Sequence, residues 1–263
     1  MSASRPSDAS QNDGDPYDRD PYYRDFAHAY DEHSRGVGGD VEFYVGLARE
    51  AGRVVELGVG TGRIAIPTAE AAIPVLGFDR ERSMLAIARE KAEEAGVSEL
   101  VTLREGDMRS FTLHEPVPLV TIPFRTFLHN LTTDDQLATL EACRRALVPG
   151  GRFALNVFNP NLPLIARWME RSGAHWEPFR GWDGFEAHQE YVPTEQVMTT
   201  SLRVRDEAGK WRRTSFRLRY VHRFEMQHLL ERAGFEVESL HGGFGGELFE
   251  EGATEMVWIA RRP

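Results

Sequence analysis

The sequence is short of residues on which several classes of protein depend. Its 263 residues include one cysteine, Cys143, and two lysines, Lys91 and Lys210. A single cysteine rules out an intrachain disulfide and argues against a zinc site made of cysteines. No long apolar run is present, so the sequence predicts neither a signal peptide nor a membrane span. We therefore expect a cytoplasmic protein with no metal and no membrane partner.

Positive charge is also scarce. The chain has 31 lysines and arginines against 41 aspartates and glutamates, a formal net charge of -10. An acidic surface repels a phosphate backbone, so nucleic acid is not an expected partner. What the chain does have is length, enough for one large α/β domain that carries an elaboration.

Composition and periodicity divide the first part of the chain into three segments. Residues 1–20 are rich in Ser, Asp, Asn and Pro and predict a disordered tail. Residues 21–51 carry aromatic and apolar residues at three- and four-residue spacing, which predicts a helical lid. Residues 52–160 alternate short apolar strands with helices. That alternation implies parallel β-α-β units and a doubly wound, ligand-binding α/β core.

The rest of the chain departs from this alternation. Residues 161–222 predict inserted antiparallel strands, with a hairpin turn at residues 206–210. We expect the insertion either to cap the substrate's site or to form a homodimer interface. Residues 223–263 return to one helix and two strands, which would complete the core.

A glycine-rich turn follows the first strand of the core. The strand at residues 53–57 runs into Gly58, Gly60 and Gly62. Glycine permits positive φ angles and close approach of a ligand to the backbone. The third glycine comes one residue earlier than in a dinucleotide fingerprint. Glu56, just before the turn, is a poor neighbour for a pyrophosphate and a good one for an ammonium group. The turn therefore indicates a phosphate-free ligand that carries an ammonium.

A carboxylate ends the next strand, in Leu76-Gly77-Phe78-Asp79. In this position Asp79 can accept hydrogen bonds from two ribose hydroxyls. The turn and the acid together indicate a nucleoside with an ammonium and no phosphate. S-adenosylmethionine has these features.

Four motifs carry a resemblance to a known family. They are Val54-Val55-Glu56-Leu57-Gly58-Val59-Gly60-Thr61-Gly62, Gly77-Phe78-Asp79 with Met84-Leu85, Glu105-Gly106-Asp107-Met108-Arg109, and Leu147-Val148-Pro149-Gly150-Gly151. Through them, residues 40–160 resemble the class I S-adenosylmethionine-dependent methyltransferases. The resemblance implies an α/β fold with a doubly wound, mostly parallel seven-stranded sheet, here with an antiparallel insertion before the last helix. It also implies S-adenosylmethionine as donor and S-adenosylhomocysteine as product.

The resemblance further implies roles in donor binding. Gly58 and Gly60 would face the methionine part, Asp79 would hold the ribose, and Asp107 would reach the adenine amino group. Met84 or Met108 would pack on the adenine. The full set of donor-binding residues that we predict is Tyr30, Glu56, Gly58, Gly60, Gly62, Asp79, Arg80, Met84, Asp107, Met108 and Phe124.

The acceptor should meet the donor beyond the fourth strand, at residues 122–130, because ligands bind outside the carboxyl ends of parallel strands. This segment lacks the Asn/Asp-Pro-Pro-Tyr/Phe motif that the resemblance would imply for methylation of nucleic-acid bases. It also lacks the aspartate of a magnesium-assisted mechanism. The spacing of Phe124 and His129 resembles the amino-sugar N-methyltransferases of antibiotic pathways. So do the inserted strands and the Ala233-Gly234-Phe235 ending of the last helix.

Several residues are candidates for work on the acceptor. His129 could act as general base, or it could only pack and hydrogen-bond while proximity supplies the rate. Alternation along residues 211–221 predicts a solvated arginine face opposite a packed tyrosine. Lid tyrosines could cover the donor's sulfonium through cation–π attraction, or simply pack on the core. The predicted substrate-binding residues are Tyr23, Arg125, His129, Trp182, Arg219 and Tyr220.

The function that these observations favour is metal-independent transfer of a methyl group from S-adenosylmethionine to N or O of a small molecule. One alternative is a regulator or scaffold that binds the donor without catalysis. Another is a nicotinamide-dependent oxidoreductase, which the early third glycine and Glu56 oppose. A protein acceptor is the third alternative.

Overall fold

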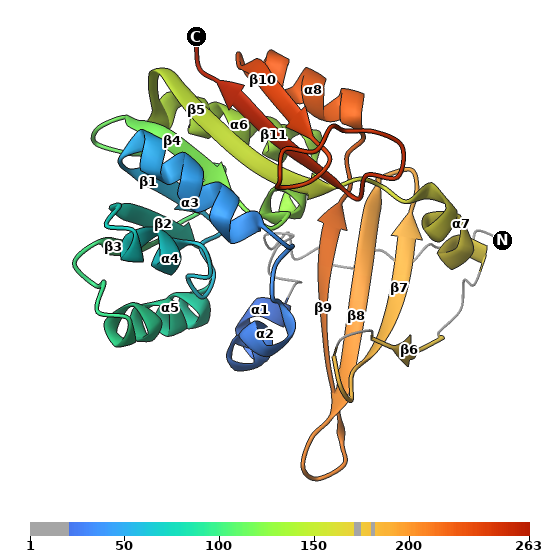
Figure 1. The fold of residues 1–263 in the computed structure, drawn as a ribbon. Helices are drawn as coiled ribbons and strands as arrows, with labels where there is room; N and C mark the ends of the chain where they lie inside the picture. Colours follow the sequence, from blue (N-terminus) through green and yellow to red (C-terminus); the bar gives the residue numbers. More distant parts are fainter. Residues whose placement is uncertain (1–20, 171–174, 180–181) are drawn as a thin grey trace, which may run out of the picture.

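The structure, a computed structural model, describes residues 21–170, 175–179 and 182–263. It contains a seven-stranded sheet with helices on both faces and a separate four-stranded sheet beside it (Figure 1). The predicted tail at residues 1–20 lies outside the described residues. No helix in the described part of the chain is long and apolar enough to cross a membrane.

The larger sheet has the order β10-β11-β5-β4-β1-β2-β3. Only β11 runs antiparallel to its neighbours, β5 and β10. This confirms the predicted fold class, an α/β fold with a mostly parallel seven-stranded sheet. The strands are β1 Val54–Leu57, β2 Val75–Asp79, β3 Val101–Glu105, β4 Val117–Ile122, β5 Leu147–Phe158, β10 Glu236–His241 and β11 Glu255–Arg261.

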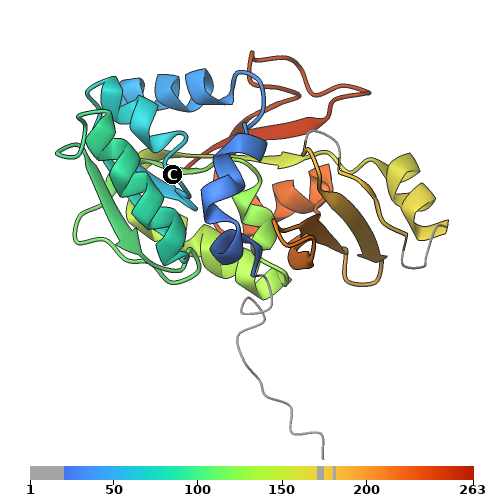
Figure 2. The same cartoon turned by 90° about the horizontal axis from the view of Figure 1, so that it is seen from below.

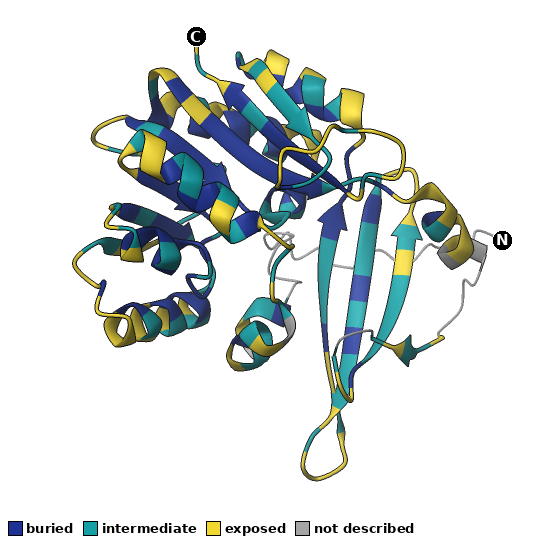
Figure 3. Ribbon diagram, in the orientation of Figure 1, coloured by how far each residue is buried: buried dark blue, intermediate teal, exposed yellow. Residues whose placement is uncertain are grey.

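Helices bury the sheet on both faces, so the central strands are almost wholly buried (Figure 3). One face packs against α3 (Asp40–Ala51), α4 (Ala65–Glu70) and α5 (Arg82–Glu94). The other face packs against α6 (Thr133–Ala146) and α8 (Arg223–Arg232). Burial of this apolar surface is the main stabilising contribution to the domain, and it leaves the carboxyl ends of the parallel strands to form a site.

The smaller sheet is antiparallel, as predicted for the insertion, with the order β6-β7-β8-β9. Its strands are β6 Glu177–Pro178, β7 Glu186–Val192, β8 Val197–Arg205 and β9 Trp211–Arg219. Helix α7 (Leu162–Glu170) precedes them and was not predicted.

Two short helices lie between the two sheets. α1 (Tyr22–Asp25) and α2 (Ala27–His33) contact α5 of the core, and α1 also contacts β9 (Figure 2). Tyr22 and Phe26 are buried in an aromatic cluster with Phe185 and Leu202 from the smaller sheet's side. The N-terminal segment is therefore fastened to the insertion as well as to the core.

Candidate functional site

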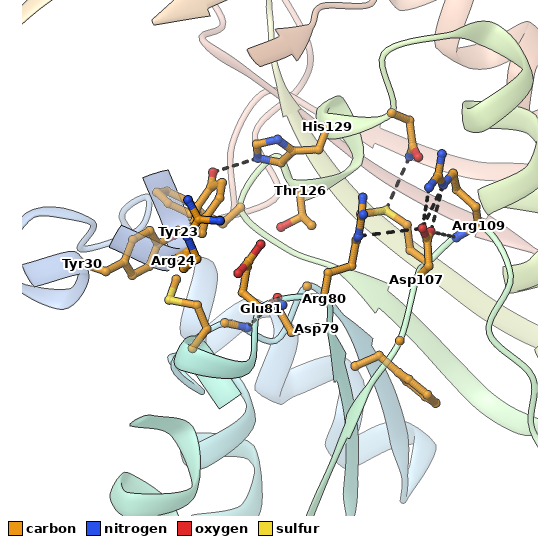
Figure 4. A pocket seen from close by; sticks show the side chains of 18 of the residues that line it. Tyr23, Arg24, Tyr30, Asp79, Arg80, Glu81, Asp107, Arg109, Thr126 and His129 are labelled. Carbon is orange, nitrogen blue, oxygen red and sulfur yellow. Dashed lines mark hydrogen bonds and ion pairs between the residues drawn. The ribbon is translucent and has the colours of Figure 1, made fainter. Parts of the chain in front are cut away.

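A cavity opens at the carboxyl ends of β1, β2, β3 and β4, under α1 and α2. Figure 4 shows tyrosines of the N-terminal helices on one side of it and Asp107 with Arg109 on the other. Most of the predicted site residues line this one cavity. They are Tyr23, Tyr30, Gly58, Gly60, Asp79, Arg80, Met84, Asp107, Met108, Phe124 and His129.

The glycine turn forms the floor of the cavity. Gly58 has φ of 68° and Gly60 has φ of 55°, a region that residues with a Cβ rarely adopt. A Cβ on Gly58 would lie 2.2 Å from Cγ2 of Thr126. The turn therefore brings backbone, rather than side chain, against whatever fills the cavity.

Asp79 ties two turns of the site together. Its Oδ2 accepts the backbone N–H of Gly60 at 2.8 Å, and its Oδ1 accepts the backbone N–H of Glu81 at 2.9 Å. Burial raises the pKa of the Asp79 carboxyl, while the backbone hydrogen bonds from Glu81 and Gly60 oppose that shift. The carboxylate is thus fixed in place at the cavity wall, with lone pairs left for a ligand's hydroxyl groups.

Two predicted donor-binding residues do not line the cavity. Gly62 packs within the core, where a Cβ would meet Cδ1 of Ile66 at 2.9 Å. Glu56 lies behind the glycine turn and is 3% exposed. Burial raises the pKa of Glu56 to about 8, with the Arg63 charge opposing the rise and the Asp79 charge adding to it. An ammonium near this carboxyl would favour its charged form.

Replacement of Glu56 by glutamine should raise the stability of the protein at pH 8 and lower its affinity for the donor. Because the folded pKa is raised above the unfolded value, the unfolded chain loses this proton first. The contribution of Glu56 to wild-type stability therefore falls as pH rises from about 4.5 to about 8. Glu56→Gln should remove that fall, so its melting temperature at pH 8 should exceed the wild-type value by a few degrees.

The same substitution should weaken binding of S-adenosylmethionine by about tenfold, since the ammonium would lose a charged partner. Thermal melting at pH 5 and pH 8, with and without donor, measures both effects. An unchanged donor affinity would contradict the role assigned to Glu56.

Asp107, at the opposite end of the cavity, sits among arginines. Its Oδ2 accepts from the guanidinium of Arg109 at 2.6 Å, and Nε of Arg80 lies 3.9 Å away. Burial raises the pKa of Asp107, but the hydrogen bonds and charge of Arg109 outweigh it and lower the pKa overall. Arg109 also binds Asp135 of α6 at 2.9 Å. The carboxylate therefore stays charged and oriented, as an acceptor for an amino group must be.

His129 and Tyr23 meet on the lid side of the cavity (Figure 4). The Tyr23 hydroxyl lies 2.8 Å from Nε2 of His129. Burial lowers the pKa of His129 to about 4, and a hydrogen bond to the backbone of Arg217 opposes that shift. A ring N–H of His129 donated to that backbone would leave Nε2 to accept from the Tyr23 hydroxyl. At neutral pH the pair is uncharged.

The N-terminal helices are also held against the glycine turn. Asp31 of α2 accepts from the Thr61 hydroxyl at 2.5 Å and from Nζ of Lys91 at 3.0 Å. Thr61 belongs to the turn that forms the cavity floor, and Lys91 belongs to α5. Asp31 therefore joins the cover of the cavity to its floor.

Loss of this link should loosen the cover without unfolding the domain. Asp31→Asn keeps the size of the side chain but removes its charge, so we expect donor affinity to fall about fivefold. The melting temperature of the free protein should change by no more than a degree or two. Glu32→Gln, the adjacent exposed acid on α2, is the matched control. Equal donor affinity for both variants, measured by calorimetry, would contradict this role.

Four predicted substrate-binding residues lie away from the cavity lining, and their role toward the acceptor stays a prediction. The guanidinium of Arg125 pairs with buried Glu255. Arg219 is not on a solvated face, because Gln136, Gln196 and Glu225 enclose its guanidinium. The other two are aromatic. Trp182 packs in the aromatic cluster that contains Tyr22 and Phe26, and Tyr220 is buried beside Tyr191 and His222.

The cavity is also lined by residues that were not predicted from the sequence. Arg109 is part of the quoted Glu105–Arg109 motif, and Thr126 falls within the segment assigned to the acceptor, so both had a signal. No sequence signal marked Arg24 or Glu81, apart from their nearness in the chain to Tyr23 and Asp79. The added residues are Pro21, Arg24, Phe78, Glu81, Gly106, Arg109, Thr126 and Asn130.

The lining fits S-adenosylmethionine. The turn at Gly58 has no room for a Cβ, as a backbone cradle for a methionine part requires. Asp79 suits a ribose, and Asp107 suits an amino group. Aromatic rings of Tyr30 and Phe124 suit a cationic sulfonium.

Comparison with known proteins defines the class. Residues 54–151 match the family described as "Methyltransferase domain". The chain is 33% identical over 132 residues to phosphatidylethanolamine N-methyltransferase of Cereibacter sphaeroides, which covers 50% of this chain and 63% of that protein. It is 24% identical over 222 residues to cypemycin N-terminal methyltransferase of Streptomyces sp, which covers 80% and 82%. The chain thus spans less than two thirds of the first of these relatives.

Solved structures agree with this match. The CcbJ methyltransferase of Streptomyces caelestis superposes with a TM-score of 0.79 at 27% identity, over 94% of this chain and 99% of that one. CalS10, an amino pentose methyltransferase of Micromonospora echinaspora, gives a TM-score of 0.61 at 23% identity, over 90% and 96%. Residues 54–151 therefore match a methyltransferase domain, and the seven-stranded sheet to which they belong has the fold of solved methyltransferases. These findings support S-adenosylmethionine as the cofactor.

Proposed function

We propose that this protein transfers the methyl group of S-adenosylmethionine to the nitrogen of a small-molecule amine, without a metal. The observation that carries the proposal is the uncharged Tyr23–His129 pair on the lid side of the cavity. With a pKa of about 4, His129 is a weak base at neutral pH. Methylation of an alcohol needs a proton removed, whereas a neutral amine offers a free lone pair.

In this proposal the chain's own residues bind and align. Asp79 would hold the ribose, Asp107 the adenine amino group, and the turn at Gly58 and Gly60 the methionine part. The Tyr23 hydroxyl donates to His129 and can accept an N–H of the acceptor, which would direct the amine lone pair into the cavity.

The bound donor supplies a methyl group that is already electrophilic. The new N–C bond forms as the S–C bond breaks, and the extra proton of the amine product leaves to solvent. Alignment and closeness of the two reactants can provide most of the rate. The names of two relatives support an amine acceptor, since they are a phosphatidylethanolamine N-methyltransferase and a cypemycin N-terminal methyltransferase.

The test is a screen with a donor that carries an isotope-labelled methyl group. Purified protein is incubated with amino sugars, other primary and secondary amines, and phenols, and the products are read by mass spectrometry. We expect label on nitrogen with an equal amount of S-adenosylhomocysteine. Label on phenolic oxygen alone would overturn the choice of nitrogen, and donor binding with no transfer would favour a non-catalytic regulator.

The smaller sheet also supports a proposal on assembly. We propose that it forms a homodimer interface, which is one of the two roles that the insertion's sequence predicts, the other being a cap over the acceptor's site. Light scattering across a concentration series measures this directly. A monomer at all concentrations would contradict it.

A further inference from the structure

The loop after β4 holds two consecutive residues in a strained conformation. Phe124 has φ of 52° and Arg125 has φ of 66°, and neither is glycine. Left-handed backbone is unfavourable for a residue with a Cβ, so the surroundings must enforce it. Strain of this kind concentrates at functional sites.

This turn and the residues after it form one wall of the cavity. Phe124 itself lines the cavity, and Thr126 and His129 follow it in the 3-10 helix η2 (Thr126–His129). Thr126 packs directly on Gly58. A small rotation of the turn would move the aromatic ring, the contact with the glycine floor and the histidine together.

A buried asparagine binds both strained residues. Asn156 of β5 is 0% exposed, and its Oδ1 accepts the backbone N–H of Phe124 at 2.7 Å. Its backbone C=O accepts the N–H of Arg125 at 3.2 Å. The same Oδ1 also accepts the hydroxyl of Tyr44 at 3.0 Å. No other described residue is shown binding both N–H groups of the turn.

A buried glutamate completes the arrangement. Glu255 of β11 is 2% exposed, and its Oε2 accepts from Nδ2 of Asn156 at 3.0 Å. Its Oε1 accepts from Nε of Arg125 at 3.1 Å and from the terminal nitrogen of the same guanidinium. Glu255 therefore fixes the orientation of the Asn156 amide and the side chain of the second strained residue at once.

We propose that Asn156 and Glu255 are positioning residues for methyl transfer, which hold the Phe124–Arg125 turn so that Phe124 and His129 face the donor's methyl group. The proposal rests on the proposed function for the reaction and adds two residues from strands outside the cavity. Neither Asn156 nor Glu255 lines the cavity, so they act through the turn.

Ligand binding alone can test the proposal. S-adenosylmethionine is positive at sulfur and S-adenosylhomocysteine is neutral, so the ratio of their affinities reports on an aromatic ring near that atom. Asn156→Ala should weaken binding of S-adenosylmethionine by about tenfold and leave that of S-adenosylhomocysteine within about twofold. Phe124→Leu removes the ring, so it gives the largest change expected in the ratio of the two affinities.

Two further variants separate positioning from general damage. Tyr44→Phe removes a different hydrogen bond to the same Oδ1, so it should lower the melting temperature yet leave the ratio unchanged. Glu255→Gln keeps the side chain's size and should lower the ratio about threefold. Adding Arg125→Gly to Glu255→Gln should restore most of the ratio, because glycine adopts this backbone conformation without strain. If Asn156→Ala does not fold, Glu255→Gln alone and Glu255→Gln combined with Arg125→Gly test the proposal instead.

Turnover provides the second readout. With an acceptor in hand, Asn156→Ala should lower kcat by tenfold or more at saturating donor, since small misplacements are costly to alignment. If the wild-type protein binds donor but transfers no methyl, the proposed function fails while the affinity ratio still tests this inference. An unchanged ratio in both Asn156→Ala and Glu255→Gln, or an equal loss in Tyr44→Phe, would overturn it.

Discussion

Asp79→Ala should lower the affinity for S-adenosylmethionine by a hundredfold or more. Two losses combine in this variant. The ribose hydroxyls would lose a charged acceptor, and each hydrogen bond to a charged group contributes about 1.5–3 kcal/mol. The backbone N–H groups of Gly60 and Glu81 would also lose the carboxylate that fixes their turns.

The control for this variant lies on the neighbouring strand. Glu105 ends β3 as Asp79 ends β2, but it is exposed and pairs with exposed Arg82. Glu105→Ala should bind the donor as the wild type does. Calorimetric titration of both variants, with melting temperatures to establish folding, gives the comparison. A loss of less than tenfold in Asp79→Ala would mean that the ribose does not depend on this carboxylate.

His129→Ala and Tyr23→Phe should each lower kcat by about tenfold, because both changes loosen the alignment of the acceptor. The two residues form one hydrogen-bonded unit, so the double variant should be no slower than His129→Ala alone. Donor affinity should change little in either variant. Steady-state kinetics at saturating donor measure these effects. Independent, multiplying losses would contradict a shared role in aligning the acceptor.

The pH dependence distinguishes alignment from base catalysis. Because burial lowers the pKa of His129 to about 4, this side chain is neutral across the neutral range. The rise of kcat/KM with pH should therefore follow the pKa of the acceptor amine and shift when the amine is changed. A limb near pH 6.5 that is the same for all acceptors and disappears in His129→Ala would instead identify a titrating base.

The same pKa has a consequence for stability. The unfolded chain binds a proton on this histidine near pH 6.5 while the folded protein does not. Stability from this group is therefore present above about pH 6.5 and is lost as pH falls toward about 4.

Local pattern was enough to predict the larger sheet and most of the residues that line the cavity. Strand ends that carry glycine or an acid, such as Gly58 and Asp79, fall at one edge of a parallel sheet whatever the rest of the chain does. The antiparallel insertion also followed from alternation. Residues in such short, periodic segments depend mainly on their sequence neighbours.

The positions of residues assigned to the acceptor depend on contacts that no local pattern reveals. Arg219 alternates as a solvated residue should, but Gln136 and Glu225, from helices on either side, bury its guanidinium. Arg125 looked free to meet a substrate, yet Glu255 lies 130 residues further along the chain. Tertiary contacts of this kind override strand alternation, because a buried charge must find a partner.

The most direct test of the account is a crystal structure of the complex with S-adenosylhomocysteine. We expect the ribose on Asp79, the adenine beside Asp107, and the sulfur atom directed toward Phe124 and the Tyr23–His129 pair. That arrangement would place the methyl group of the donor on the lid side of the cavity. A sulfur atom turned away from this pair, or a ribose bound elsewhere, would contradict it.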